Sequence, residues 1–139
     1  MSASLQRPAE AAELAAFGDF LQAFWRSQSL PPEALFPFEL ALEEIFLNVA
    51  LHGRPADGTL PTVEVRLTRD DRAVRMVILD DGLRFDPLSR ESPDVHAALE
   101  DRPIGGLGIH LVRTLMDGAA WRHVDGRNEL TLTRNLDKA

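Results

Sequence analysis

The chain has 139 residues, 45% of them hydrophobic and 27% charged, which is the size and composition of one soluble globular domain spanning residues 1–139. Its formal net charge of −7 at pH 7 argues against a nucleic-acid partner, because nucleic-acid-binding domains usually carry a basic face for the phosphates. The absence of cysteine from the sequence excludes disulfides, zinc–cysteine sites and thiol nucleophiles.

Two helices are predicted in the first 53 residues. Pro8 and the acidic residues after it suit a first helical turn, and apolar residues recur at helical spacing over residues 14–25, so the first helix should begin at Pro8 and end near Ser29. The second helix should cover residues 37–53 and end with Gly53 as its C-cap.

Two antiparallel hairpins are predicted further along the chain. Apolar and polar residues alternate over residues 63–67 and again over residues 74–78, on either side of a polar turn. The final hairpin should join residues 119–124 to residues 128–136 through a turn at residues 125–126.

A long loop and a third helix separate these hairpins. Residues 86–103 contain three prolines and many polar residues, so they should form a loop with at most a short helix at residues 94–99. The third helix follows a glycine-rich start at residue 105. The order helix, helix, hairpin, helix, hairpin predicts an α+β fold, a two-layer sandwich of a mixed, mainly antiparallel sheet with helices on one face.

Three groups of residues could carry chemistry, and the first lies on the second helix. Glu44, Asn48 and His52 are four residues apart, so at about 100° per residue they form one polar stripe within an otherwise apolar face of the helix. Polar side chains in such a place need partners. They could belong to a ligand site, or Asn48 could be a satisfied core amide and His52 a favourable charge at the helix end.

The second group follows the strand over residues 74–80. Strand parity places Asp80 on the same face as Ile78, whereas Asp81 points with Arg75. A buried carboxylate before Gly82 could accept a hydrogen bond from a ligand amine, or it could cap the turn, which is the commoner role of an isolated Asp-Asp-Gly.

The third group is the glycine-rich segment "IGGLGIHLVRTLMD". Gly105, Gly106 and Gly108 precede or open a predicted helix, where free backbone N–H groups attract phosphates. The same glycines could instead allow close helix packing. Ile109 is also available to face the core.

Several other enzyme classes are excluded. Lys138 is the only lysine, whereas P-loop NTPases and eukaryotic-type protein kinases need an interior lysine on the nucleotide phosphates. G-x-S-x-G and H-E-x-x-H are absent.

No segment has the apolar length to span a bilayer, and residues 1–14 do not form a leader, so we expect a cytoplasmic protein without a membrane partner.

Together the three groups resemble a known set of motifs. E-x-x-x-N-x-x-x-H, then D-x-G followed by "FDP", then G-G-x-G at a helix start resemble the N, G1 and G2 boxes of the superfamily that contains gyrase, the heat-shock chaperone ATPases, sensor histidine kinases and mismatch-repair ATPases. The segments "ELALEEIFLNVALHG" and "GGLGIHLVRTLMD" are most similar to the bacterial anti-sigma factor serine/threonine kinases of partner-switching pathways. The resemblance covers essentially the whole chain, in motif order.

This resemblance implies a histidine-kinase-like ATPase fold that binds Mg²⁺-ATP. Glu44 would be the catalytic residue, as a general base or a water-positioning carboxylate, Asn48 a ligand of Mg²⁺ and of ATP, and Asp80 the acceptor of the adenine amino group. Residues 86–103 would form a lid over the nucleotide. The remaining residues implied to bind ATP are His52, Gly82, Arg84, Gly105, Gly106, Leu107, Gly108 and Ile109.

Arg84 departs from the family pattern. Where the family commonly has D-x-G-x-G-F-D, this chain has Arg84 in place of the second glycine. Arginine adopts positive φ far less easily than glycine and brings a permanent charge near the expected phosphate path. It could help to bind phosphate, or mark a branch with weakened catalysis.

Three functions follow from these observations. The first is a kinase that phosphorylates a serine or threonine of an antagonist protein and sequesters a sigma factor or equivalent regulator, with a homodimer as a further expected assembly. The second is an ATP- or ADP-sensing module that changes partners without transferring phosphate. The third, a structural domain without a ligand, requires three ordered motifs to be accidental.

Overall fold

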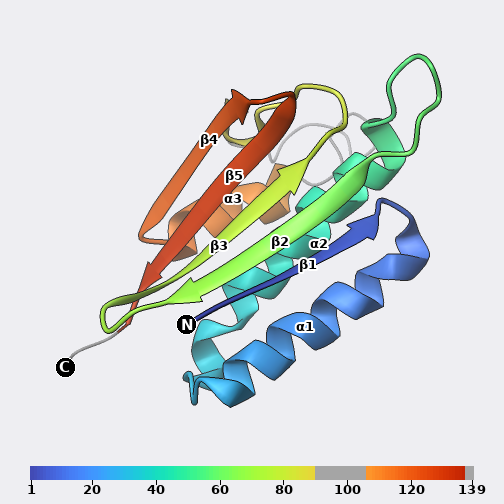
Figure 1. Cartoon of the computed structure of the whole chain (residues 1–139). Helices are drawn as coiled ribbons and strands as arrows, with labels where there is room; N and C mark the ends of the chain where they lie inside the picture. Colours follow the sequence, from blue (N-terminus) through green and yellow to red (C-terminus); the bar gives the residue numbers. More distant parts are fainter. Residues whose placement is uncertain (90–105, 137–139) are drawn as a thin grey trace.

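The structure is a computed structural model and describes residues 1–89 and 106–136. Within these residues five strands form a single sheet in the order β1-β2-β3-β5-β4, and each of the four pairings between neighbours is antiparallel (Figure 1). The strands are β1 (Ser2–Pro8), β2 (Thr62–Arg69), β3 (Ala73–Asp80), β4 (Gly118–Val124) and β5 (Arg127–Asn135).

Three α-helices in the described parts of the chain cover one face of this sheet, with α2 between α1 and α3 (Figure 1). They are α1 (Leu14–Ser27), α2 (Phe36–His52) and α3 (Gly106–Leu115), and short 3-10 turns occur at Ala11–Glu13, Pro32–Ala34 and Pro87–Ser89. The predicted α+β sandwich with helices on one face is therefore confirmed. None of the helices in the described parts of the chain is long and apolar enough to cross a bilayer.

The core lies between the sheet and the helices. The inward side chains of the β2–β3 hairpin alternate with outward ones as predicted, and none of the six is more than 1% exposed: Val63, Val65, Leu67, Val74, Met76 and Ile78. Phe17 of α1 and Phe46 of α2 pack on them, with ring centroids 5.4 Å apart. The same parity carries Asp80 onto this face at the end of β3, where it is 5% exposed.

The start of the first helix was predicted wrongly. Ser2–Pro8 is a strand that pairs antiparallel with β2, from Ser2 opposite Thr68 to Pro8 opposite Thr62, and the α-helix begins only at Leu14. The strand satisfies the backbone N–H and C=O groups on the outer side of β2, which local helical propensity does not take into account.

The other boundaries agree with the sequence pattern. The α2 helix ends at His52, and the N–H of Gly53 donates to the carbonyl of Val49 over 2.9 Å. In the β4–β5 turn, Asp125 and Gly126 have φ values of 53° and 75°, as a type I′ turn requires. The predicted helix at residues 94–99 and most of the predicted lid lie outside the described residues.

Candidate functional site

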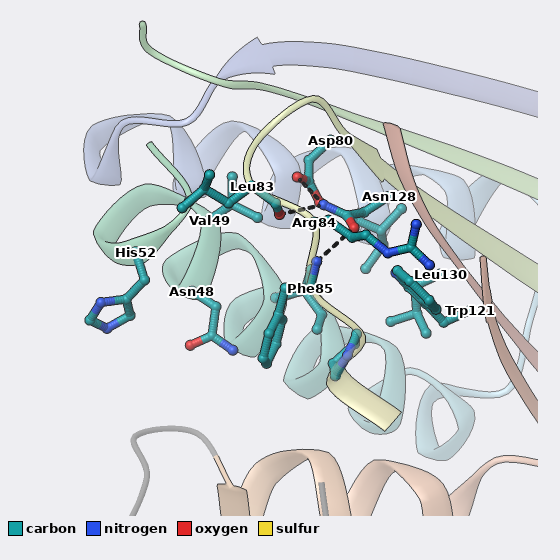
Figure 2. A pocket seen from close by; sticks show the side chains of 14 residues that line it. Asn48, Val49, His52, Asp80, Leu83, Arg84, Phe85, Trp121, Asn128 and Leu130 are labelled. Carbon is teal, nitrogen blue, oxygen red and sulfur yellow. Dashed lines mark hydrogen bonds between the residues drawn. The ribbon is translucent and has the colours of Figure 1, made fainter. Parts of the chain in front are cut away.

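A pocket of about 210 Å³ lies between α2, the ends of β3 and β5, and the segment after β3 (Figure 2). Its wall is mainly apolar, with a few polar side chains, which is the usual composition of a small-molecule site. The lining residues are Ile45, Asn48, Val49, His52, Gly53, Ile78, Asp80, Leu83, Arg84, Phe85, Pro87, Trp121, Asn128 and Leu130.

Asp80 supplies a buried carboxylate to this pocket. Its Oδ1 accepts hydrogen bonds from the N–H of Gly82 and from Nδ2 of Asn128, each 3.0 Å long, whereas Oδ2 has no partner among the described residues. Burial raises the pKa of Asp80 above its usual 3.8, and the two hydrogen bonds oppose that shift. One carboxylate oxygen therefore remains available to a donor on a ligand.

Asn128 organises this end of the pocket. It is the direct register partner of Asp80 across the β3–β5 pairing and is 5% exposed. Its Nδ2 also donates to the carbonyl of Leu83 over 2.9 Å, and its Oδ1 accepts from the N–H of Phe85 over 3.0 Å (Figure 2). One amide side chain therefore holds both the carboxylate of Asp80 and the backbone after β3.

Asn128 was not predicted as a site residue from the sequence. The available signal was its parity, since Asn128 occupies the inward face that Leu130 and Leu132 also occupy. Sequence alone does not give the register that places it opposite Asp80.

Gly82 lets the end of α2 approach the segment after β3. A Cβ atom at Gly82 would lie 2.7 Å from the carbonyl oxygen of Gly53, closer than such atoms approach in proteins. That same carbonyl accepts a hydrogen bond of 2.8 Å from the N–H of Leu83. This contact places the last turns of α2 opposite Asp80.

The three polar residues of the stripe on α2 lie in two different environments. Asn48 is half-buried and His52 is exposed, and both line the pocket. Glu44 lies one turn earlier and packs against the first turn of α3, where a Cβ atom on Gly108 would lie 2.6 Å from Glu44 Cγ. At Gly108, α3 therefore lies so close to Glu44 that a side chain at residue 108 would collide with it.

The glycine-rich segment is described only in part. Gly105 lies outside the described residues, Gly106 is the first residue of α3, and Leu107 is described through its helical backbone alone. Ile109 is 5% exposed and its side chain belongs to the hydrophobic core, so a nucleotide could contact only its backbone.

Arg84 and Trp121 form the side of the pocket that faces away from Asn48. The Arg84 guanidinium carbon lies 5.4 Å from the centroid of the Trp121 ring. Figure 2 shows Asn48 and His52 on one side of the pocket, Arg84 and Trp121 on the other, and Phe85 between them. Trp121 belongs to none of the sequence motifs and was not predicted as a site residue.

The donor set fits Mg²⁺ only as an ion that is held largely by its substrate. Among the described residues, no three His, Asp or Glu side chains lie close enough together to hold a metal. Mg²⁺ typically keeps several waters and uses substrate phosphates with one or two protein ligands. Asn48 could be such a ligand at the edge of this pocket.

Comparisons with known proteins give three findings. The family described as "Histidine kinase-like ATPase domain" matches residues 7–134. The chain is 32% identical over 102 residues to the serine/threonine-protein kinase BtrW of Bordetella bronchiseptica, covering 70% of this chain and 68% of BtrW. It is 29% identical over 96 residues to the serine-protein kinase RsbW of Bacillus cereus, covering 66% of this chain and 59% of RsbW.

The structure also has a close counterpart among solved structures. The crystal structure of the RsbU and RsbW domains of Rv1364c from Mycobacterium tuberculosis superposes with a TM-score of 0.70. The match covers the whole of this chain and 33% of the other chain, at 16% identity, and therefore establishes a common fold.

Proposed function

Because the chain belongs to the histidine kinase-like ATPase domain family, we propose that it is a protein kinase that transfers the γ-phosphate of ATP to a serine or threonine of an antagonist protein. The observation that carries this proposal is the pocket around Asp80, in which a buried carboxylate keeps Oδ2 without a protein partner. The kinase names of BtrW and RsbW support the reaction.

Asp80 is the group that would recognise the base. The amino group of adenine is a donor and suits the carboxylate oxygen Oδ2, whereas guanine presents a carbonyl acceptor at the corresponding position. Apolar neighbours such as Val49 and Ile78 would cover the base. The site should therefore prefer ATP to GTP.

Asn48 and the start of α3 are the proposed phosphate-binding elements. Asn48 would ligate Mg²⁺, which supplies charge neutralisation for the transferred phosphoryl group. The glycines at the start of α3 would offer backbone N–H groups, as helix N-termini do for phosphates. His52 lies one turn after Asn48 and also lines the pocket.

Glu44 is the proposed general base. It lies one helical turn from Asn48 and beside Gly108, next to the expected position of the phosphates. As the substrate hydroxyl oxygen bonds to the γ-phosphorus, the bond from that phosphorus to the bridging oxygen of ADP breaks, and the hydroxyl proton passes to the Glu44 carboxylate.

The proposed partners are an antagonist protein and a sigma factor or equivalent regulator. In a partner-switching pathway the kinase would phosphorylate its antagonist and sequester a sigma factor or equivalent regulator, in the cytoplasm and as a homodimer.

A second candidate function rests on Arg84. An arginine in place of the second glycine of the D-x-G-x-G pattern is compatible with a module that binds ATP or ADP and changes partners without catalysis. Glu44 distinguishes the candidates, since a module that only senses nucleotide has no need of a base beside the phosphates.

Radiolabelled ATP tests the proposal directly. Purified protein is incubated with Mg²⁺ and γ-labelled ATP, with and without the antagonist protein encoded nearby. Label on a serine or threonine of the antagonist supports the kinase. Calorimetric binding of ATP without any transfer contradicts it and favours the sensing module.

A further inference from the structure

Trp121 presents a buried hydrogen-bond donor at the pocket. Its register partner on β5 is Leu130, which is 3% exposed, so the indole lies on the helix-covered face of β4. The Nε1–H of Trp121 is buried, and no group in residues 1–89 or 106–136 accepts a hydrogen bond from it. Indole N–H is a donor only, and buried donors are nearly always paired in native proteins. Trp121 lines the pocket, so a ligand bound there is the candidate acceptor.

Arg84 lies over the ring of Trp121. Its guanidinium lies 5.4 Å from the ring centroid, within the range of a cation–π interaction. The backbone on both sides of Arg84 is fixed by Asn128, through the carbonyl of Leu83 and the N–H of Phe85. The position of the arginine therefore follows from hydrogen bonds that also hold Asp80.

The position of this pair indicates which part of a nucleotide it would meet. Asn48, the proposed ligand of the Mg²⁺-bound phosphates, lies on the opposite side of the pocket (Figure 2). Asp80, the proposed reader of the adenine amino group, is linked to the Arg84 segment through Asn128. Arg84 and Trp121 are thus at the nucleoside end of the site.

We propose that Arg84 and Trp121 form a nucleoside-binding wall that lies outside the glycine-rich and α2 motifs. The Nε1–H of Trp121 donates a hydrogen bond to an acceptor of the bound nucleoside, and Arg84 positions the indole by stacking on it. This inference rests on the proposed function, because it takes an adenine nucleotide as the occupant of the pocket. It also assigns Arg84 a planar stacking role in place of phosphate binding.

Calorimetry with Mg²⁺-ATP and with adenosine tests the wall. Trp121→Phe keeps an aromatic ring but removes the N–H, and should weaken both ligands about threefold to tenfold, the usual net effect of one hydrogen bond. Arg84→Lys keeps the charge but loses the planar group, so it should weaken both ligands about twofold to fivefold, and Arg84→Gln should do the same.

Arg122→Gln is the matched control. Arg122 is the next residue on β4 but is exposed, points to the opposite face of the sheet and pairs with Glu129 at 2.6 Å. Its loss removes one positive charge near Trp121 without changing the pocket, and should leave both affinities unchanged.

Tryptophan fluorescence gives a second readout. The chain has two tryptophans, and Trp25 is held in the core with its Nε1 donating to the carbonyl of Pro31 over 3.0 Å. Saturating ATP should change the emission of the wild-type protein through Trp121. The Trp121→Phe variant, which retains only Trp25, should show no such change.

The possible results separate the wall from the function on which it rests. If the wild-type protein binds neither Mg²⁺-ATP nor adenosine, both proposals are overturned. If it binds them and Trp121→Phe also binds both within about twofold of wild type, the indole N–H contributes less than one ordinary hydrogen bond, and only the wall is overturned. If Arg84→Gln weakens ATP much more than adenosine while Arg84→Lys behaves as wild type, Arg84 is a phosphate contact and the nucleoside assignment is wrong.

Discussion

Asn128 Nδ2 lies 3.0 Å from Asp80 Oδ1, and the two residues are direct partners across β5 and β3. Because Asn128 donates to Oδ1, and the N–H of Gly82 does so as well, the other carboxylate oxygen is the one left for a ligand. The orientation of the candidate base-reading group is therefore determined by a residue 48 positions away in the sequence.

Asn128→Asp should make nucleotide binding depend on pH. An ionised carboxylate at residue 128 cannot donate to Asp80 and repels it, so ATP affinity at pH 7 should fall by about tenfold or more, the scale of a lost hydrogen bond to a charged group. As pH falls and the pair takes up a proton, affinity should partly return. Calorimetry between pH 5.5 and 8 measures this. Gln6→Glu, an exposed amide-to-acid change on β1, should bind ATP as wild type at every pH.

Asp80→Asn should change base preference. The hydrogen bonds from Gly82 and Asn128 would hold the amide oxygen, so the NH₂ group would take the place of Oδ2 and face the adenine amino group, donor against donor. ATP affinity should fall by about 1–3 kcal/mol, and GTP should lose less or gain. Equal affinities of the wild-type protein for ATP and GTP would contradict the role of Asp80. Asp81→Asn removes the same charge from the neighbouring exposed position and should leave the preference intact.

The same substitution should raise stability at neutral pH. Burial raises the pKa of Asp80, so protonation of this residue is more favourable in the folded state than in the unfolded state. The stability linked to that proton is fully present below the ordinary pKa and is lost as pH rises through the folded pKa. Asp80→Asn keeps a neutral group at this position, so its melting temperature should exceed that of wild type at pH 7, and the difference should vanish in acid.

Asp70→Asn is the control, because its melting temperature at pH 7 should change in the opposite direction. The N–H groups of Arg72 and Ala73 donate to the Asp70 carboxylate and lower its pKa. The resulting stability is present above the ordinary aspartate pKa and is lost as pH falls through the folded pKa. Asp70→Asn should therefore lower the melting temperature at pH 7, with the difference disappearing at low pH. A loss of stability at pH 7 in Asp80→Asn as large as in Asp70→Asn would contradict the analysis of Asp80.

Glu44→Gln should separate catalysis from binding. Removing a general base typically slows a reaction by about two or more orders of magnitude, so phosphorylation of the antagonist should fall by that factor while ATP affinity changes little. Glu43→Gln, an exposed neighbour on α2 that does not line the nucleotide pocket, should retain activity. Equal rates for Glu44→Gln and wild type would remove Glu44 from the reaction.

Gly108→Ala should act through Glu44. A Cβ atom at residue 108 would lie 2.6 Å from Glu44 Cγ, so the glutamate side chain has to move. Transfer to the antagonist should fall by about tenfold or more, an appreciable part of the contribution of a general base, with an unchanged melting transition. In the Glu44→Gln background the added alanine should have little further effect on the rate, because residues in contact are not additive. Full additivity of the two rate effects would show that Gly108 acts elsewhere.

Much of the fold and part of the site follow from local patterns in the sequence. Period-two alternation predicts the β2–β3 hairpin and places Asp80 on the inward face, and the four-residue spacing of Glu44, Asn48 and His52 places them on one side of α2. These predictions succeed because burying one face of a strand or helix imposes a repeat that neighbouring residues display.

Contacts between distant strands were decided only by the tertiary structure. The edge strand β1 forms because β2 offers it unpaired backbone groups, against the local helical signal around Pro8. Asn128 reaches Asp80, and Trp121 meets Arg84, because the β3–β5 and β4–β5 registers bring these positions into one pocket. A sequence determines side-chain parity within each strand through local sterics, whereas register is set by packing among elements that are far apart along the chain.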